Sequence, residues 1–330
     1  MCLLERANAA IMNACLVDLS AKVVAAFRTA LAELVLKVPF FISQNDGTLM
    51  SADMVEKYPV HTFASGPTNS MRGAAFLSGV ENAIVVDIGG TTTDIGVLKN
   101  GFPRESTAQV DIGGVRTNFR MPDLYSIGLG GGTIIDKNNP CQLGPQSVGH
   151  KLERDSMVFG GKCLTATDIT VAARGIDIGQ AENIAGLDKK FVESATTAIH
   201  VMIDNAIDRM KTSTEAIPII LVGGGEILVH RSHDLPSASA IMRPKTGAVA
   251  NAIGAAIAHV GGEIDRVFDF NELGRDKALE IAKSAAIERA IAAGASRDGV
   301  RIVEIDEIPL AYLAGSVRVH AKAVGELDLA

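Results

Sequence analysis

The sequence predicts an α/β protein, and three observations lead to this prediction. Residues 83–98 consist of two apolar segments rich in β-branched residues on either side of a glycine–threonine turn, which indicates a β-hairpin. Residues 217–222 are again apolar and run into three glycines, as expected for a buried strand that ends in a turn. Apolar residues that recur every three or four positions in residues 17–34 and 191–210 indicate amphipathic helices. Helices of this kind typically cover a sheet.

Composition limits the kinds of protein that this chain can be. It has 330 residues, 47% hydrophobic and 21% charged, which is enough for two domains with a sizeable core. The net charge of −7 argues against a surface for nucleic acid or for an anionic membrane. We expect no membrane span and no signal peptide, because no apolar run of sufficient length is evident. The four cysteines form no Cys-x-x-Cys pair, so we predict a reduced, cytoplasmic protein without a cysteine-bound metal.

The N-terminal segment predicts a long helix followed by a short strand at residues 40–42. One buried helix face is indicated by apolar residues that include Val17, Val24 and Phe27. A long helix is an unusual beginning for an α/β domain, because helices in such domains usually cover a sheet already laid down. We therefore expect either that Met1 is not the natural start or that a partner chain supplies the missing layer.

The turn of the predicted hairpin carries the residues of a phosphate site. Asp87 ends the first strand and Asp94 begins the second. The residues between them include Gly89, Gly90, Thr91, Thr92 and Thr93. Glycine lets an anion approach the backbone closely, and the turn amides and threonine hydroxyls can donate to a polyphosphate. A carboxylate at each end of the turn suits Mg²⁺, so Asp87 and Asp94 are candidate metal ligands. A plain hairpin with a polar turn is the structural alternative.

Two further glycine clusters are candidates for the same site. Residues 128–132, which include Gly130 and Gly131, offer either amides that face phosphate or a structural bend. No long apolar strand precedes this cluster, so it does not match the dinucleotide-binding fingerprint. The cluster Gly223–Gly225 follows the apolar strand and predicts either a flat surface for an adenine ring and ribose or a simple turn.

The remaining segments predict helices and strands but no further functional site. A helix of small residues is predicted for residues 247–262, followed by a charged helix from Glu263 and by strands at 300–305 and 317–324. His230 and His233, with Asp234, lack a third ligand at metal-binding spacing, and we predict no metal site there. No P-loop and no Gly-x-Ser-x-Gly elbow is present in the sequence.

In this order, the hairpin, the strand ending in Gly223–Gly225 and the helix at 247–262 resemble the actin-like ATPase superfamily. Within it, the chain is similar to the hydantoinase A/5-oxoprolinase family. The motifs that carry this resemblance are Ser65-Gly66-Pro67, Gly73-Ala74-Ala75, Asp87–Asp94, Gly128–Gly132, Leu164–Asp168 and Glu307–Ala311. The resemblance implies an actin-like ATPase (ribonuclease H-like) lobe, with a mixed sheet flanked by helices.

The resemblance also implies that part of the fold is missing. Full-length relatives carry an Asp-x-Gly-Gly-Thr-x-Thr-Asp run in an N-terminal domain as well, whereas here this run occurs once. Residues 1–80 are then the remainder of an incomplete first lobe with a hinge helix, and residues 81–262 the second lobe with the nucleotide motifs. Residues 263–330 are a helix–strand–strand appendage. A missing N-terminal domain or a hydantoinase B-like subunit is the implied partner, and a homo-oligomer stays open.

The function implied by the resemblance is ATP-dependent opening of a cyclic amide such as a hydantoin or 5-oxoproline. ATP and Mg²⁺ are the implied cofactors, and the amide carbonyl oxygen is phosphorylated before water attacks the carbon. The hairpin residues, Gly130, Gly131 and Gly223–Gly225 are expected to bind nucleotide, and Asp87 and Asp94 to hold the metal. No catalytic base is identified.

Three other functions remain open at this point. Related carboxylase subunits, in which ATP activates bicarbonate or a ketone, share these motifs. Sugar kinases of the repressor/kinase type have a similar first loop, but they usually carry a His and Cys zinc cluster that is not visible here. A non-catalytic ATP-binding or structural subunit is the third alternative. We expect this chain by itself to lack hydrolase activity.

Overall fold

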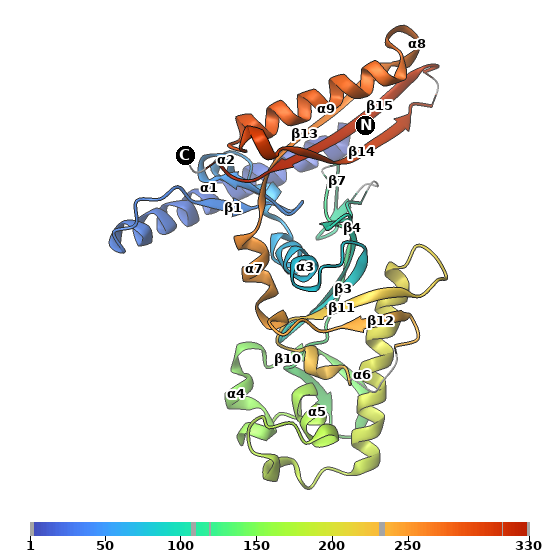
Figure 1. The fold of residues 1–330 in the computed structure, drawn as a ribbon. Coiled ribbons are helices and arrows are strands. Elements are labelled where there is room, and N and C mark those ends of the chain that lie inside the picture. Colours follow the sequence, from blue (N-terminus) through green and yellow to red (C-terminus); the bar gives the residue numbers. More distant parts are fainter. Residues whose placement is uncertain (1–2, 107–109, 119, 231–234, 312, 329–330) are drawn as a thin grey trace. The chain divides into compact units, whose positions relative to one another are not determined.

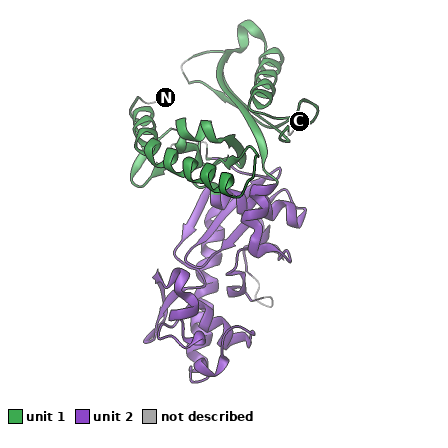
Figure 2. Cartoon of the chain, turned by 90° about the vertical axis from the view of Figure 1, so that its left-hand side faces the viewer, with its two compact units in different colours: residues 1–65, 106–121, 257–330 green, residues 66–105, 122–256 purple. Residues whose placement is uncertain are grey.

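The computed structural model describes residues 3–106, 110–118, 120–230, 235–311 and 313–328. These residues form two compact units, each built from segments that are distant in sequence (Figure 2). Unit 1 comprises residues 1–65, 106–121 and 257–330, and unit 2 comprises residues 66–105 and 122–256. Each unit is described by itself below.

Unit 2 is organised around a mixed sheet of six strands (Figure 1). The strands are β3 (Ala83–Ile88), β4 (Thr93–Lys99), β5 (Phe102–Pro103), β8 (Leu124–Ile127), β11 (Ile217–Val222) and β12 (Ala238–Met242). The order is β12-β11-β3-β4-β5, and β8 also pairs with β4. Strand β11 runs parallel to β3 and β12, whereas β4 runs antiparallel to β3, β5 and β8. The predicted hairpin and the predicted strand at 217–222 are therefore confirmed, as is the α/β class with a mixed sheet.

The other elements of unit 2 are mostly helical. They are α3 (Ser65–Ser78), β9 (Thr133–Asp136), β10 (Asn139–Ser147), η2 (Gly149–Lys151), α4 (Leu152–Asp155), η3 (Met157–Phe159), α5 (Ala166–Arg174), η4 (Ala181–Ile184), α6 (Lys189–Met210), η5 (Glu226–Leu228), η6 (Gly247–Val249) and α7 (Ala250–Ala256). Helix α5 begins with a capping box, in which the side chains of Thr165 and Asp168 each bind the backbone of the other residue. Helix α6 confirms the amphipathic helix predicted for residues 191–210.

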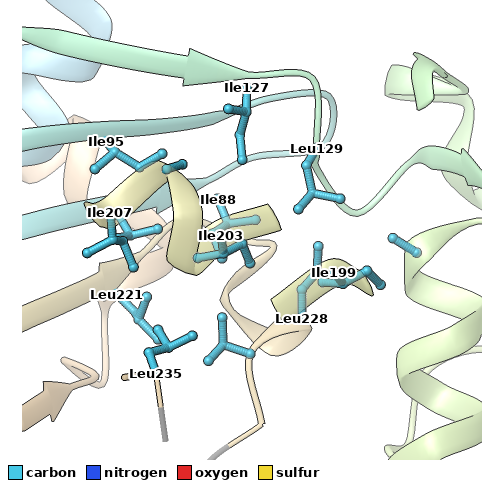
Figure 3. Packing of buried hydrophobic residues seen from close by; sticks show 14 of the residues in the cluster. Ile88, Ile95, Ile127, Leu129, Ile199, Ile203, Ile207, Leu221, Leu228 and Leu235 are labelled. Carbon is cyan, nitrogen blue, oxygen red and sulfur yellow. The ribbon is translucent and has the colours of Figure 1, made fainter. Parts of the chain in front are cut away.

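The two faces of the sheet bury different sets of helices. Ile88 and Ile95 lie on the face that packs against Ile203 and Ile207 of α6, in the larger apolar core of the unit (Figure 3). The opposite face packs against α3 and α7 in a second, smaller core. The buried residues of this core, which come from both the sheet and the two helices, are Met71, Ala74, Ala75, Ala83, Val85, Leu98, Ile220, Val222 and Ala250. Because neighbouring residues of a strand point to opposite faces, Asp87 shares this second face with Ala83 and Val85.

Helices α3 and α7 approach each other closely because two glycines lie at their contact. A Cβ added at Gly73 would lie 2.0 Å from the carbonyl oxygen of Ala250, and one added at Gly254 would lie 1.8 Å from that of Asn69. The small residues that the sequence concentrates in these helices therefore pack backbone against backbone. This contact holds α3, which carries Ser70, against the second face of the sheet.

Unit 1 contains a five-stranded sheet in the order β1-β2-β13-β15-β14. Its elements are α1 (Leu3–Glu33), β1 (Phe41–Ser43), β2 (Thr48–Ser51), α2 (Ala52–Lys57), η1 (Pro59–Thr62), β6 (Val110–Ile112), β7 (Val115–Thr117), β13 (His259–Asp269), α8 (Phe270–Leu273), α9 (Arg275–Ala292), η7 (Arg297–Gly299), β14 (Arg301–Pro309) and β15 (Ser316–Gly325). Alanines of α9 pack on β13 and β15 in a separate core.

Strand β13 corrects two sequence predictions. The helix expected for residues 247–262 ends at Ala256, and residues 263–269, expected to begin a charged helix, are strand. Two glycines explain the close packing of this strand. A Cβ at Gly262 would lie 2.1 Å from the backbone nitrogen of Ala290 in α9, and one at Gly261 would lie 2.7 Å from the side chain of Thr48. The charged residues that resembled a solvated helix face instead alternate along one face of the sheet.

The long N-terminal helix is present, but the prediction that its apolar face is buried is wrong. Only Val24 of the three apolar residues named above is fully buried, and Phe27 is 54% exposed. By length and composition alone, α1 also qualifies as a candidate membrane span, with a mean hydropathy of 1.6 in its most apolar window and 11% of that window buried. The expectation that no apolar segment reaches this length is therefore wrong.

The lobe boundaries after residues 80 and 262 remain a prediction. They describe how this chain would divide within a larger two-lobed fold, whereas units 1 and 2 are defined by the packing of this chain alone.

The contact between α3 and α7 leads to a first prediction. Replacement of Gly73 by alanine should lower the free energy of unfolding by about 1–3 kcal/mol, because the new methyl group collides with backbone that cannot rotate away. The matched control is Gly186→Ala, where an added Cβ meets nothing within 4 Å. Urea denaturation of the two variants measures the difference. Equal stabilities would contradict the close packing of the helices.

Candidate functional site

The predicted metal ligands Asp87 and Asp94 lie directly opposite each other in the β3–β4 ladder. Directly opposite residues of an antiparallel pair project from the same face, with Cβ atoms roughly 5 Å apart. The next strand extends this row, since Ser126 of β8 lies opposite Asp94 and donates its hydroxyl hydrogen bond to the Asp94 carboxylate. Three neighbouring strands thus carry two carboxylates and a hydroxyl in one line.

Asp87 is the more constrained of the two carboxylates. Burial raises the pKa of Asp87 above its ordinary value of 3.8, a hydrogen bond from Ser70 of α3 opposes this, and the negative charge of Asp94 raises the pKa further. Like charges directly opposite each other in a sheet destabilise it. The pair is therefore an arrangement that a cation would relieve.

The turn between the carboxylates has a defined orientation. It is closed by a hydrogen bond from the Gly89 amide to the Thr92 carbonyl, 2.9 Å long. The carbonyl oxygens of Gly89 and Gly90 accept hydrogen bonds from the amides of Gly131 and Gly132, at 3.0 and 2.7 Å. In a trans peptide the N–H of the next residue points away from the carbonyl. The amides of Gly90 and Thr91 therefore point away from residues 131 and 132.

These outward-facing amides are available to a ligand. Gly90, Thr91 and Thr92 are exposed, and no acceptor for their amides is found among the described residues. Successive unpaired amides of a turn form an anion-binding concavity. Thr93 differs from its neighbours, because its buried hydroxyl donates a 2.6 Å hydrogen bond to the Leu129 carbonyl. Within this hairpin, Thr91 and Thr92 are the threonines whose hydroxyls can reach a ligand.

The second glycine cluster packs against the back of this turn. A Cβ at Gly130 would lie 2.6 Å from the backbone nitrogen of Thr91, so only glycine fits there. The carbonyl of Gly131 accepts hydrogen bonds from both the amide and the hydroxyl of Thr167, at 3.0 and 2.9 Å. Both glycines are buried. These contacts fit the structural bend, one of the two alternatives left open by the sequence. Binding of nucleotide by Gly130 and Gly131 remains a prediction.

The third cluster meets the hairpin from the other neighbouring strand. The amide of Gly225 donates a 2.7 Å hydrogen bond to the Ile88 carbonyl. Gly223 has a φ of +86°, and a Cβ at this position would lie 2.4 Å from an oxygen of the Asp87 carboxylate. Gly224 is exposed, with nothing within 4 Å of an added Cβ. This cluster therefore provides an open backbone surface beside Asp87.

The fold brings all the predicted site residues together, although they come from three segments. The ligand roles assigned to them remain predictions. Three residues that hydrogen-bond to the site were not predicted. Ser70 donates to Asp87, Ser126 to Asp94, and Thr167 to the carbonyl of Gly131. Their signal was weak, because each is a common hydroxyl residue whose partner is distant in sequence. His233 and Asp234 of the rejected metal pair lie outside the described residues.

Together these groups suit a phosphate chain with a hard divalent cation. The two carboxylates supply oxygen ligands of the kind that Mg²⁺ accepts together with waters and phosphate oxygens. The outward amides of the turn supply donors for the phosphates, and Gly224 leaves room for a flat group. A Mg²⁺–nucleotide complex thus fits the residues present.

The sequence of this chain is similar to those of a known family and of two curated enzyme subunits. The family model for hydantoinase/oxoprolinase matches residues 6–201. The gamma subunit of acetophenone carboxylase from Aromatoleum aromaticum is 30% identical over 138 residues, which are 40% of this chain and 19% of that subunit. The alpha subunit of caprolactamase from Pseudomonas jessenii is 27% identical over 175 residues, covering 51% of this chain and 25% of that subunit.

Two solved structures have similar folds. The ATP-dependent caprolactamase from Pseudomonas jessenii has a TM-score of 0.74 at 17% identity, covering 98% of this chain and 58% of that one. Nucleotide-free acetone carboxylase has a TM-score of 0.63 at 18% identity, covering 93% of this chain and 55% of that one. The chain thus spans little more than half of these solved chains, and about a fifth to a quarter of the curated relatives.

The raised pKa of Asp87 leads to a second prediction. The folded state holds the Asp87 proton more tightly than the unfolded state does, so stability falls as pH rises from 3.8 through the folded pKa. Relative to Asp87→Asn, the wild-type chain should therefore lose free energy of unfolding across this window. Urea denaturation at several pH values measures the difference. Asp94→Asn removes the neighbouring charge and should reduce the pH dependence; a pH-independent difference would contradict the assignment.

Proposed function

The chain belongs to the hydantoinase/oxoprolinase family, and on this premise we propose that it is the nucleotide-binding part of an ATP-dependent enzyme that phosphorylates a carbonyl oxygen. The observation that carries the proposal is the pair Asp87 and Asp94 on one face of the hairpin, with the exposed amides of Gly90 and Thr91 between them. Cation ligands and anion donors lie within one turn, which is what a Mg²⁺–polyphosphate complex requires.

The proposed substrate is a cyclic amide of the hydantoin, 5-oxoproline or lactam type. Phosphorylation of the carbonyl oxygen activates the amide carbon, and water adds to it. The ring C–N bond then breaks, with the nitrogen leaving as a protonated amine, and a second water hydrolyses the resulting acyl phosphate to a carboxylate and inorganic phosphate. In phosphoryl transfer most of the catalysis comes from positioning and from stabilisation of charge on the transferred group. Asp87 and Asp94 would hold Mg²⁺ directly or through water, and Thr91 and Thr92 would donate to the phosphates. The caprolactamase alpha subunit, whose name indicates a lactam substrate, supports this reaction class.

A carboxylase is the second candidate, and a specific observation favours it. The acetophenone carboxylase gamma subunit is 30% identical to this chain over its matched region. In that reaction class ATP would activate bicarbonate or the ketone, and the same hairpin would hold the nucleotide. The two candidates share the phosphate chemistry and differ in the group that attacks the activated carbon, which is water in the hydrolase and a carbon atom of the ketone in the carboxylase. The nucleotide site by itself does not separate them.

The activity is also proposed to need further protein. The first lobe of the fold, supplied by additional chain or by a partner subunit, is the proposed cover for helix α1. The support is that large apolar residues of this helix are exposed, among them Leu3, Leu4, Ile11, Leu19 and Phe27. The curated relatives are named as subunits and are much longer than this chain. Protein cover of α1 is consistent with the cytoplasmic location that we propose.

Nucleotide binding by the chain is the third prediction. Calorimetric titration should detect binding of Mg²⁺–ATP and Mg²⁺–ADP that Asp87→Ala and Asp94→Ala weaken at least about tenfold, equivalent to ~1.4 kcal/mol. Asp177→Ala, which changes an exposed carboxylate of the same unit, is the matched control and should bind as the wild type does. Binding that survives in both hairpin variants would refute the proposed metal and phosphate site.

Turnover is the fourth prediction and uses the complete enzyme. The 330-residue chain alone should not hydrolyse hydantoin, 5-oxoproline or caprolactam, whereas the chain joined to its missing lobe and partner subunit should. ATP consumption is followed with each ring substrate, and separately with a ketone with and without bicarbonate. ATP turnover that depends on bicarbonate identifies a carboxylase. Robust lactam hydrolysis by the isolated chain would contradict the need for further protein.

A further inference from the structure

A second concentration of charged residues lies in unit 1, on the face of β13, β15 and β14 that faces away from α9. Side chains of β15 alternate between the two faces: Val319 and Ala321 lie in the core beneath α9, whereas His320 and Lys322 point to the other face. His320 is 1% exposed and Lys322 is 2% exposed. At these two residues of β15, the polar face of the sheet is therefore as deeply buried as its apolar face.

His320 is the central residue of this buried face. It lies directly opposite Asp265 of β13 on one side and Asp306 of β14 on the other. Its Nε2 atom is 3.3 Å from a carboxylate oxygen of Glu263. Its Nδ1 atom is buried and has no hydrogen-bond partner. Such an orphaned nitrogen destabilises the folded protein unless a ligand binds to it.

Two carboxylates of β14 lie within reach of this imidazole. One ligand atom each from Glu304, Asp306 and His320 lie within 4.8 Å of one another. An oxygen of Asp306 is also buried without a hydrogen bond, although the Arg120 guanidinium lies 3.5 Å from it. Two of the three residues of this cluster, His320 and Asp306, therefore each carry a buried polar atom without a hydrogen-bond partner.

The charged residues around this cluster form a network of ion pairs. Arg318 pairs with Asp265, Lys322 with Asp46, and Arg120 with Asp306. Beside these pairs, Glu304 and Asp306 place carboxylate oxygens next to the imidazole of His320.

We propose that Glu304, Asp306 and His320 form a binding site for a divalent metal ion of the zinc type. One imidazole nitrogen and two carboxylate oxygens are a donor set that zinc accepts, with water as the fourth ligand. Nδ1 is the nitrogen left for the metal, because Nε2 is used by Glu263. A carboxylate on the second nitrogen of a metal-bound histidine is a recurrent arrangement that orients the ring.

The donor atoms of Glu304, Asp306 and His320 must move slightly closer together to bind a zinc ion. Donor atoms about a tetrahedral zinc, with bonds of 2.0–2.2 Å, lie roughly 3.4 Å apart, compared with the 4.8 Å span found here. Glu304 is only half-buried and has three rotatable side-chain bonds, so it can supply most of this movement. The site lies in unit 1, whereas Asp87 and Asp94 lie in unit 2. The proposal therefore does not rest on the proposed function.

The fifth prediction tests this site with Zn²⁺ alone. The chain is stripped with EDTA, and its four cysteines (Cys2, Cys15, Cys141 and Cys163) are replaced by serine so that thiols do not bind the ion. Calorimetry without nucleotide should detect one Zn²⁺ per chain. Glu304→Gln and His320→Gln should weaken binding at least tenfold, and Glu263→Gln about 10–100-fold through the ring orientation. Co²⁺ should give a visible absorption band that Glu304→Gln removes.

The controls separate the site from the rest of the molecule. Glu280→Gln alters a carboxylate on exposed helix surface and should bind Zn²⁺ as the parent chain does. If His320→Gln fails to fold, the half-buried Glu304→Gln still decides the outcome. Absence of saturable binding, or undiminished affinity in Glu304→Gln, would overturn the proposal and leave His320 as a member of an ion-pair network only.

Discussion

The packing of unit 2 around the candidate site depends on the Gly89 carbonyl oxygen, because three glycine-rich segments meet at this atom. It accepts a hydrogen bond from Gly131, and a Cβ at either Gly130 or Gly225 would lie 2.7 Å from it. Any side chain at those two positions would separate the segments. Close approach therefore fixes which way the Gly89 and Gly90 peptides face, and this in turn directs the amides of the turn outward. The orientation of the amides that we propose to bind phosphate thus follows from backbone packing on the opposite side of the turn.

The two candidate sites share one device, a row of polar side chains across neighbouring strands. In unit 2 the row is Asp87, Asp94 and Ser126; in unit 1, His320 stands between Asp265 and Asp306. The register of strand pairing places directly opposite residues roughly 5 Å apart. Their positions therefore do not depend on the conformation of a loop. A sheet whose other face is packed with apolar residues holds these rows rigidly. Both rows concentrate negative charge, which is favourable only when a cation or a hydrogen-bond donor is present.

Local patterns made much of unit 2 predictable from the sequence. The turn Asn100–Gly101 illustrates this, since both residues have the positive φ that its type I′ signal requires. Contacts between distant segments were not predictable in the same way. Ser70 reaches Asp87 only because Gly73 lets α3 and α7 pack closely, and nothing near Ser70 in the sequence indicates that partner. Strand β13 was missed for a different reason. Its charged residues lie close in sequence to the charged residues of α9, and both were assigned to one helix beginning at Glu263.

The magnitudes explain how the ligand-free chain can tolerate opposed carboxylates. A like-charge pair across a ladder costs on the order of 0.2–1 kcal/mol, and part of this is offset by the hydroxyls of Ser70 and Ser126. A ligand present at a hundred times its dissociation constant adds about 2.7 kcal/mol to the stability of the state that binds it. The stability gained when a ligand binds thus exceeds the stability lost to repulsion between the two carboxylates in the ligand-free chain. Strand register keeps Asp87 and Asp94 opposed whether or not a cation is bound, so binding needs no rearrangement of the hairpin.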